Sequence, residues 1–159
     1  MQPIAIAYGL CALIVFGLAV ASRRAPLIEL GLILTVAWLG CNAIVLRYGY
    51  AGSTLLIPTL DAILALCVAA VAGSHQNKVA VLVLALFVVV QLVHVTAFEL
   101  HAQGGHFHIL ALNLLFLCQL VAVGGAGVAS LVGRIATTPG MAARFSRGGI
   151  FARRRTRGG

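Results

Sequence analysis

Five apolar stretches, each about the length of a membrane-spanning helix, make up most of this chain. A hydrocarbon layer about 30 Å thick needs about 20 consecutive apolar residues in a helix. Inside that layer no water can pair with backbone groups, so each stretch must form its hydrogen bonds internally, as a helix does. The sequence therefore predicts an all-α, polytopic membrane helix bundle with about five transmembrane helices within residues 1–133, at residues 4–21, 27–46, 55–73, 79–98 and 107–132.

The composition excludes an ordinary soluble domain. Hydrophobic residues make up 62% of the 159 residues and charged residues only 9%, whereas about 25% of a typical soluble domain is charged. The four cysteines, Cys11, Cys41, Cys67 and Cys118, lie inside apolar stretches and lack the close pairing of zinc ligands. We interpret them as core or lipid-facing residues.

The distribution of cations predicts the orientation of the chain. Lys and Arg are retained on the cytoplasmic side of a membrane. With five spans, Arg23, Arg24, Lys78 and the C-terminal arginines fall on one side, and only Arg47 falls on the other. We therefore expect the N-terminus outside and the C-terminus inside. The first stretch also offers a signal-peptide-like cleavage site at "AVAS", but arginines follow it instead of preceding it, so we retain it as a span.

Five polar residues on four of the predicted helices fall at similar depths below the outer ends of those helices. They are Asn42, Asp61, Gln91, His94 and Asn113. If they face one another, they form a polar, proton-sensitive cluster in a cavity open to the outer side, in which Asp61 carries charge and His94 titrates near neutral pH. Alternatively they act only as hydrogen bonds between helices. The sequence does not show which way the side chains point.

Asp61 also has a simpler explanation. Pro58 suits the first turn of a helix, so the helix is expected to begin near it, with Asp61 still in the first turn. A carboxylate there is stabilised by the helix dipole, and Arg47 on the same side is a candidate partner.

The stretch "FELHAQGGHFHILALN" holds three of the five histidines and one of the three acidic residues. Glu99, His101, His106 and His108 are candidate metal ligands, and His106 and His108 would point the same way if that segment is extended. Their spacing matches no standard metal motif, and only His94 lies deep enough in a span to bind haem. We expect no metal, no cofactor and no catalytic site, and therefore no enzyme.

The last apolar stretch contains "GGAGVASLVG", in which Gly125, Ala129 and Gly133 recur every four residues. Small residues at this spacing let another helix backbone approach closely. The sequence predicts a helix-packing face, either inside the chain or between the subunits of a homo-oligomer.

Residues 134–159 form an arginine-rich tail without an acidic residue. The tail has too little apolar surface for a core and is expected to be disordered or interfacial. Cations next to a membrane helix attract anionic lipid headgroups; nucleic acid is an alternative partner, because "RGG" occurs twice. The arginines expected to make these contacts are Arg144, Arg147, Arg153, Arg154, Arg155 and Arg157.

The layout of the chain, and "ALNLLFLCQL" at residues 111–120 in particular, resembles small phage and prophage membrane proteins, including holin-like proteins. Five spans exceed the number usual for holins. The resemblance implies a pore former that oligomerises in a bacterial inner membrane, which is where we expect this multi-pass protein to lie. Two alternatives remain: a small transporter or ion- or pH-sensing protein that uses Asp61 and His94, and a scaffold subunit whose tail recruits cytoplasmic partners.

Overall fold

The computed structural model describes residues 3–101, 103 and 105–137. In this part of the chain all the regular structure is helical. The helices are α1 (Pro3–Ser22), α2 (Ala25–Gly52), α3 (Leu56–His75), α4 (Lys78–Glu99) and α5 (His106–Ala136). Each is long and apolar enough to span a membrane, which confirms the predicted all-α, multi-span architecture. The orientation of the chain in the membrane stays a prediction.

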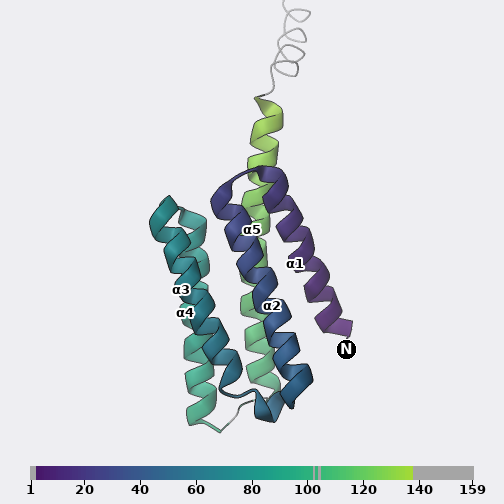
Figure 1. The fold of residues 1–159 in the computed structure, drawn as a ribbon, viewed down its shortest axis with the longest axis vertical. Coiled ribbons are helices and arrows are strands. Elements are labelled where there is room, and N and C mark those ends of the chain that lie inside the picture. Colours follow the sequence, from purple (N-terminus) through teal and green to yellow (C-terminus); the bar gives the residue numbers. More distant parts are fainter. Residues whose placement is uncertain (1–2, 102, 104, 138–159) are drawn as a thin grey trace, which may run out of the picture.

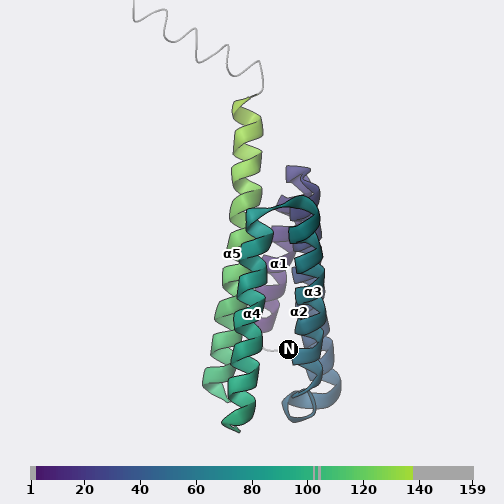
Figure 2. The ribbon, with the colours of Figure 1, turned by 90° about the vertical axis from the view of Figure 1, so that its left-hand side faces the viewer.

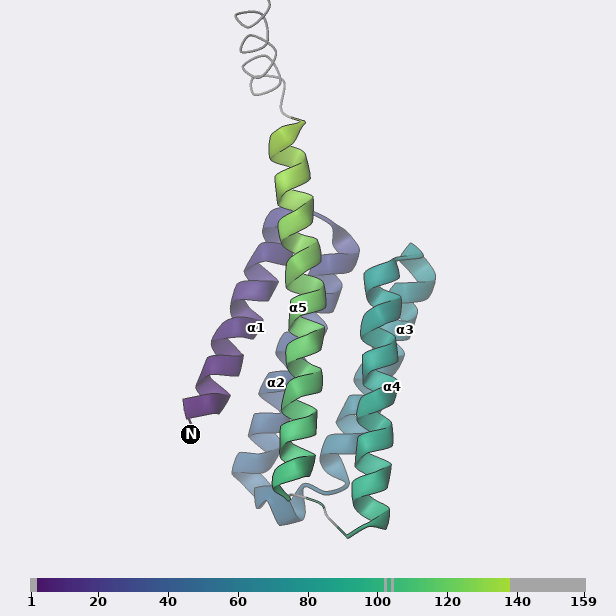
Figure 3. The same cartoon turned by 180° about the vertical axis from the view of Figure 1, so that it is seen from behind.

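Consecutive helices run antiparallel (Figure 1), and the contacts between them close the bundle into a ring. Each helix packs against its neighbours in sequence, α1 also packs against α5, and α2 contacts α5 across the middle of the ring. α5 extends beyond the other helices at one end (Figure 2). Seen from behind, α5 lies between α1 and α4 (Figure 3). At the opposite end of the bundle α2 and α4 finish and α3 and α5 begin. We call this the cavity end, because the cavity described below reaches it.

Several helix boundaries differ from the sequence prediction. α2 continues past residue 46 and contains a non-helical glycine, Gly49, with φ 68° and ψ 175°. α3 begins at Leu56, before Pro58, so Asp61 lies in the second turn of the helix and not in the first. α5 continues to Ala136, so the first residues of the predicted disordered tail are helical. Arg134 lies there and donates to the Ala21 carbonyl at 3.2 Å, which ties α5 to the end of α1.

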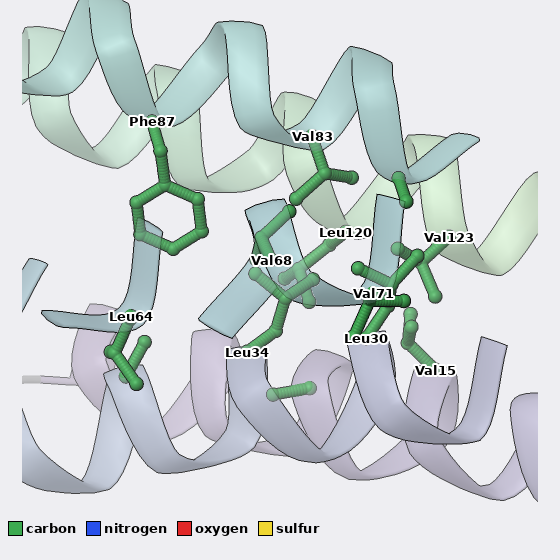
Figure 4. Close-up of a cluster of buried hydrophobic side chains, with 13 residues drawn as sticks. Val15, Leu30, Leu34, Leu64, Val68, Val71, Val83, Phe87, Leu120 and Val123 are labelled. Atoms are coloured by element: carbon green, nitrogen blue, oxygen red, sulfur yellow. The ribbon is translucent and has the colours of Figure 1, made fainter. Parts of the chain in front are cut away.

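The core is apolar and lies between the helices away from the cavity end. Phe87, Val83, Val68, Leu34 and Leu120 point toward one another from α2, α3, α4 and α5 and are almost completely buried (Figure 4). Most of the other large apolar side chains face outward, as they must in a protein surrounded by lipid. Because lipid tails are as apolar as leucine, close packing holds such helices together more than burial from water does.

The small residues of α5 form two different faces. Gly127 lies against α1, where an added Cβ atom would be 3.4 Å from the Cβ of Leu18. Gly125, Ala129 and Gly133 lie on the exposed side of α5. A Cβ atom added at Gly125 or Gly133 would meet nothing within 4 Å. The alternative that this predicted face packs inside the chain is therefore wrong; contact with a second subunit stays a prediction.

Candidate functional site

Three ionisable side chains from three helices form a continuous chain of hydrogen bonds near the cavity end. Asp61 Oδ2 on α3 lies 3.1 Å from His94 Nε2 on α4. His94 Nδ1 lies 3.2 Å from His108 Nε2 on α5. Both ring nitrogens of His94 are therefore engaged, one by a carboxylate and the other by a second imidazole.

The chemistry of the three groups determines where the protons lie when Asp61 is ionised and both histidines are neutral. An ionised carboxylate can only accept, so His94 must carry its proton on Nε2. A neutral imidazole has one donor and one acceptor, so His94 Nδ1 accepts and His108 Nε2 donates. A proton added to His94 makes both of its nitrogens donors. The bond to His108 must then reverse, which couples the protonation of His94 to the tautomer of His108.

The Asp61–His94 pair is well shielded. The side chain of Asp61 is 11% exposed and that of His94 is 6% exposed. Taking charges out of water costs several kcal/mol per ion, and partners offset this cost. Each member of the pair therefore offsets the cost of burying the other. Asp61 pairs with His94, whereas the sequence offered Arg47 as a candidate partner.

The hydrogen-bonded side chains of Asp61, His94 and His108 line a cavity of about 740 Å³ at the same end of the bundle. This volume lies in the range of about 300–1,000 Å³ that is typical of small-molecule sites. Ser53, Thr54 and Gln103 from the links at the cavity end contribute to the wall, so the cavity reaches the end of the bundle. Its inner part is lined by Phe87 and Gln119. At 1.5 Å per residue, Gln119 lies about 20 Å from the start of α5.

Aromatic side chains form much of the remaining wall. They are Tyr8, Trp38, Phe87, Phe98 and Phe116. The rings of Tyr8 and Phe116 meet edge to face with centroids 6.0 Å apart, which links α1 to α5. Trp38 on α2 donates from Nε1 to the Ala5 carbonyl on α1 at 3.0 Å. Trp38 is the single tryptophan of the chain, so its fluorescence reports on the cavity.

All five members of the predicted polar layer line this one cavity. Asp61 and His94 bond to each other, and Gln91 Nε2 on α4 donates to the Pro58 carbonyl on α3 at 3.2 Å. Asn42 Nδ2 instead donates to the Trp38 carbonyl of its own helix at 2.8 Å. The layer therefore lines a cavity, as the first interpretation of the sequence predicted, and it also forms hydrogen bonds between helices, as the alternative predicted.

The histidine-rich segment is arranged differently from the expectation. His106 and His108 lie in the first turn of α5. Because they are two residues apart in a helix, they start about 200° apart around its axis, so the assumption of an extended segment is wrong. Glu99 and His101 are exposed. Within the described residues, no group of three or more His, Cys, Asp or Glu side chains is arranged so that it could hold a metal ion.

Two residues of the site were not placed in the polar layer from the sequence. His108 completes the hydrogen-bonded chain. Gln119 is only 2% exposed, and its Nε2 has no hydrogen-bond partner among the described residues. The short link between α4 and α5 was a usable signal for His108, because it brings the start of α5 beside the end of α4.

A second carboxylate–histidine pair lies near the opposite end, between Glu29 on α2 and His75 on α3. The two side chains are 3.3 Å apart and are 45% and 33% exposed, respectively. Exposed pairs contribute little stability. This pair is therefore a matched control for the buried Asp61–His94 pair.

Comparison of the chain with protein-family models, with curated proteins and with solved structures gives no match. Its function must be inferred from its own residues and their geometry. The six arginines assigned to lipid or anion contact lie outside the described residues.

Proposed function

We propose that this integral membrane protein senses or transports a small solute in a proton-dependent way, with the Asp61–His94–His108 chain as its proton-binding element. The observation that carries the proposal is the continuous hydrogen-bonded chain along the wall of a cavity. Ionisable residues within a membrane are costly and mark ion or proton pathways by default. Histidine is also the residue type that changes charge between about pH 5 and 8.

The direction in which the cluster faces favours this function over pore formation between subunits. Asp61 and His94 point into the cavity of a single chain and are shielded from its outer surface. Beyond Phe87 and Gln119 the bundle is filled by apolar side chains such as Val68 and Val83. A cavity open at one end and closed by an apolar core suits the binding step of a sensor or of a transporter.

The proposal predicts that the fluorescence of Trp38 depends on pH. Purified protein in detergent or nanodiscs should show a change in Trp38 emission between about pH 8 and about pH 5, because a protonated imidazole in the same cavity changes the field around the indole. His94→Gln should remove or displace the transition. His75→Gln, which alters the exposed pair, should leave it unchanged. A flat titration of the wild type, or an identical transition in His94→Gln, would contradict the proposal.

A holin-like, pore-forming assembly is the second candidate. The exposure of Gly125, Ala129 and Gly133 along α5 favours it, because this face is free to pack against another copy. Gly125→Leu should then remove oligomer bands on a crosslinking gel. Gly17→Leu is the matched control, since an added Cβ atom at Gly17 on α1 also meets nothing within 4 Å. Identical ladders from the wild type and Gly125→Leu would argue against a role for this face.

A further inference from the structure

We propose that the cavity binds a small amphipathic organic cation, with its positive charge near Asp61 and its apolar body against the aromatic wall. This inference rests on the proposed function, because it names the class of solute for the same site.

The charges of the cavity wall favour a cation. Among the described residues that line the cavity, Asp61 is the only acidic residue, and none is Lys or Arg. When His94 is neutral, it donates to the carboxylate without cancelling its charge. An anion would therefore meet an uncompensated negative charge in a shielded site, whereas a cation would be attracted to it. Interactions between charges are stronger in such surroundings than in water.

The aromatic wall favours a cation with an apolar body. The faces of Trp, Tyr and Phe attract cations within about 6 Å of the ring centroid, most strongly when water is excluded. Trp38, Tyr8 and Phe116 contribute such rings, and the same rings offer apolar surface. A small, strongly hydrated metal ion would not use this surface, but an organic cation would.

Gln119 independently indicates a ligand. Its amide nitrogen is buried without a hydrogen-bond partner among the described residues, at the inner part of the cavity. A buried polar group without a partner is destabilising, because it has given up its hydrogen bonds to water. Because an amide nitrogen donates, a hydrogen-bond acceptor on the ligand would satisfy it.

Protons should compete with the cation. Besides Asp61, the titratable groups among the described residues that line the cavity are Tyr8 on α1, Cys41 on α2, His94 on α4, and His106 and His108 on α5. In the range between about pH 5 and 8 the histidines are the ones expected to change charge. Acidification adds positive charge beside Asp61, so it should weaken cation binding. By reciprocity, cation binding should release protons.

The test uses tetraphenylphosphonium and tetraphenylborate, which share one shape and carry opposite charges. Binding to the full-length protein in nanodiscs is followed by calorimetry and by Trp38 emission, with empty nanodiscs as the blank. We expect tetraphenylphosphonium to bind more weakly near pH 5 than near pH 8, and tetraphenylborate not to bind specifically. Asp61→Asn should weaken cation binding by at least about thirtyfold, the equivalent of losing one buried charge partner. Glu29→Gln should leave it unchanged.

The outcomes separate this inference from the proposed function. Equal binding of both probes, or wild-type affinity of Asp61→Asn for the cation, would overturn the inference. If the cation fails to bind while the pH titration of Trp38 persists, the inference fails and the proton-dependent function stands. If the titration is also absent, both fail. An unchanged far-ultraviolet circular dichroism spectrum and an unchanged gel-filtration profile of Asp61→Asn verify that this variant is folded.

Discussion

Replacing His94 with leucine is expected to lower the free energy of unfolding by about 3 kcal/mol at neutral or alkaline pH. The substitution leaves Asp61 in a shielded position without its partner on α4, and a buried charge that has lost its partner is strongly destabilising. Reversible unfolding in mixed micelles, followed by the emission of Trp38, measures the effect.

A double substitution distinguishes the loss of a charge partner from the loss of packing. If the cost arises from the unpaired carboxylate, Asp61→Leu combined with His94→Leu should recover most of the stability, because apolar replacement of a whole buried pair is often neutral or stabilising. His75→Leu in the exposed pair should change stability by less than about 1 kcal/mol. Strictly additive effects of the two substitutions would show that Asp61 and His94 are not energetically coupled.

The membrane bundle could be predicted from the sequence because hydrocarbon allows few structures. An apolar stretch of sufficient length must satisfy its own backbone groups, and this requirement locates a helix without any knowledge of packing. Helix ends were predicted less well. The segment "RYGYAG" that ends α2 is less apolar than the span, so hydropathy placed the end of the helix several residues too early.

The sequence predicted how deep each polar residue lies along its helix, but it did not predict which way each helix is rotated about its axis. Counting residues from helix ends placed Asp61 and His94 at similar depths, since the rise per residue of a helix is fixed. Which way a side chain faces depends on how each helix is rotated against its neighbours. In this chain both the lipid-facing and the core-facing sides are apolar, so no polar stripe marks the outer face. The contact between Asp61 and His94 therefore could not be predicted from the sequence, and only the structure shows it.

Two misinterpretations have similar physical causes. His106 and His108 were considered as part of an extended segment, yet α5 begins at His106 and carries His108 toward His94. On the same helix "GGAG" offers two neighbouring stripes of small residues. The rotation of α5 against α1 turns Gly127 inward and leaves Gly125 exposed. The spacing of the small residues does not predict this rotation.

The protonation of His94 and His108 should change together. Nitrogen NMR of protein labelled with ¹⁵N-histidine distinguishes the two neutral tautomers and the charged form, and His→Gln variants assign the five histidines. At alkaline pH, we expect both His94 and His108 to carry the proton on Nε2 and to leave Nδ1 unprotonated, because Asp61 Oδ2 accepts from His94 and His94 Nδ1 accepts from His108.

This titration is the measurement that tests the central claim most directly. On acidification, the signals of His94 and His108 should shift with a shared dependence on pH, while those of His75 follow their own course. In Asp61→Asn the acceptor carboxylate is gone, so the tautomer preference of His94 should weaken and the shared transition should move or disappear. Independent titration of His94 and His108, or a neutral His94 that carries its proton on Nδ1, would contradict the account.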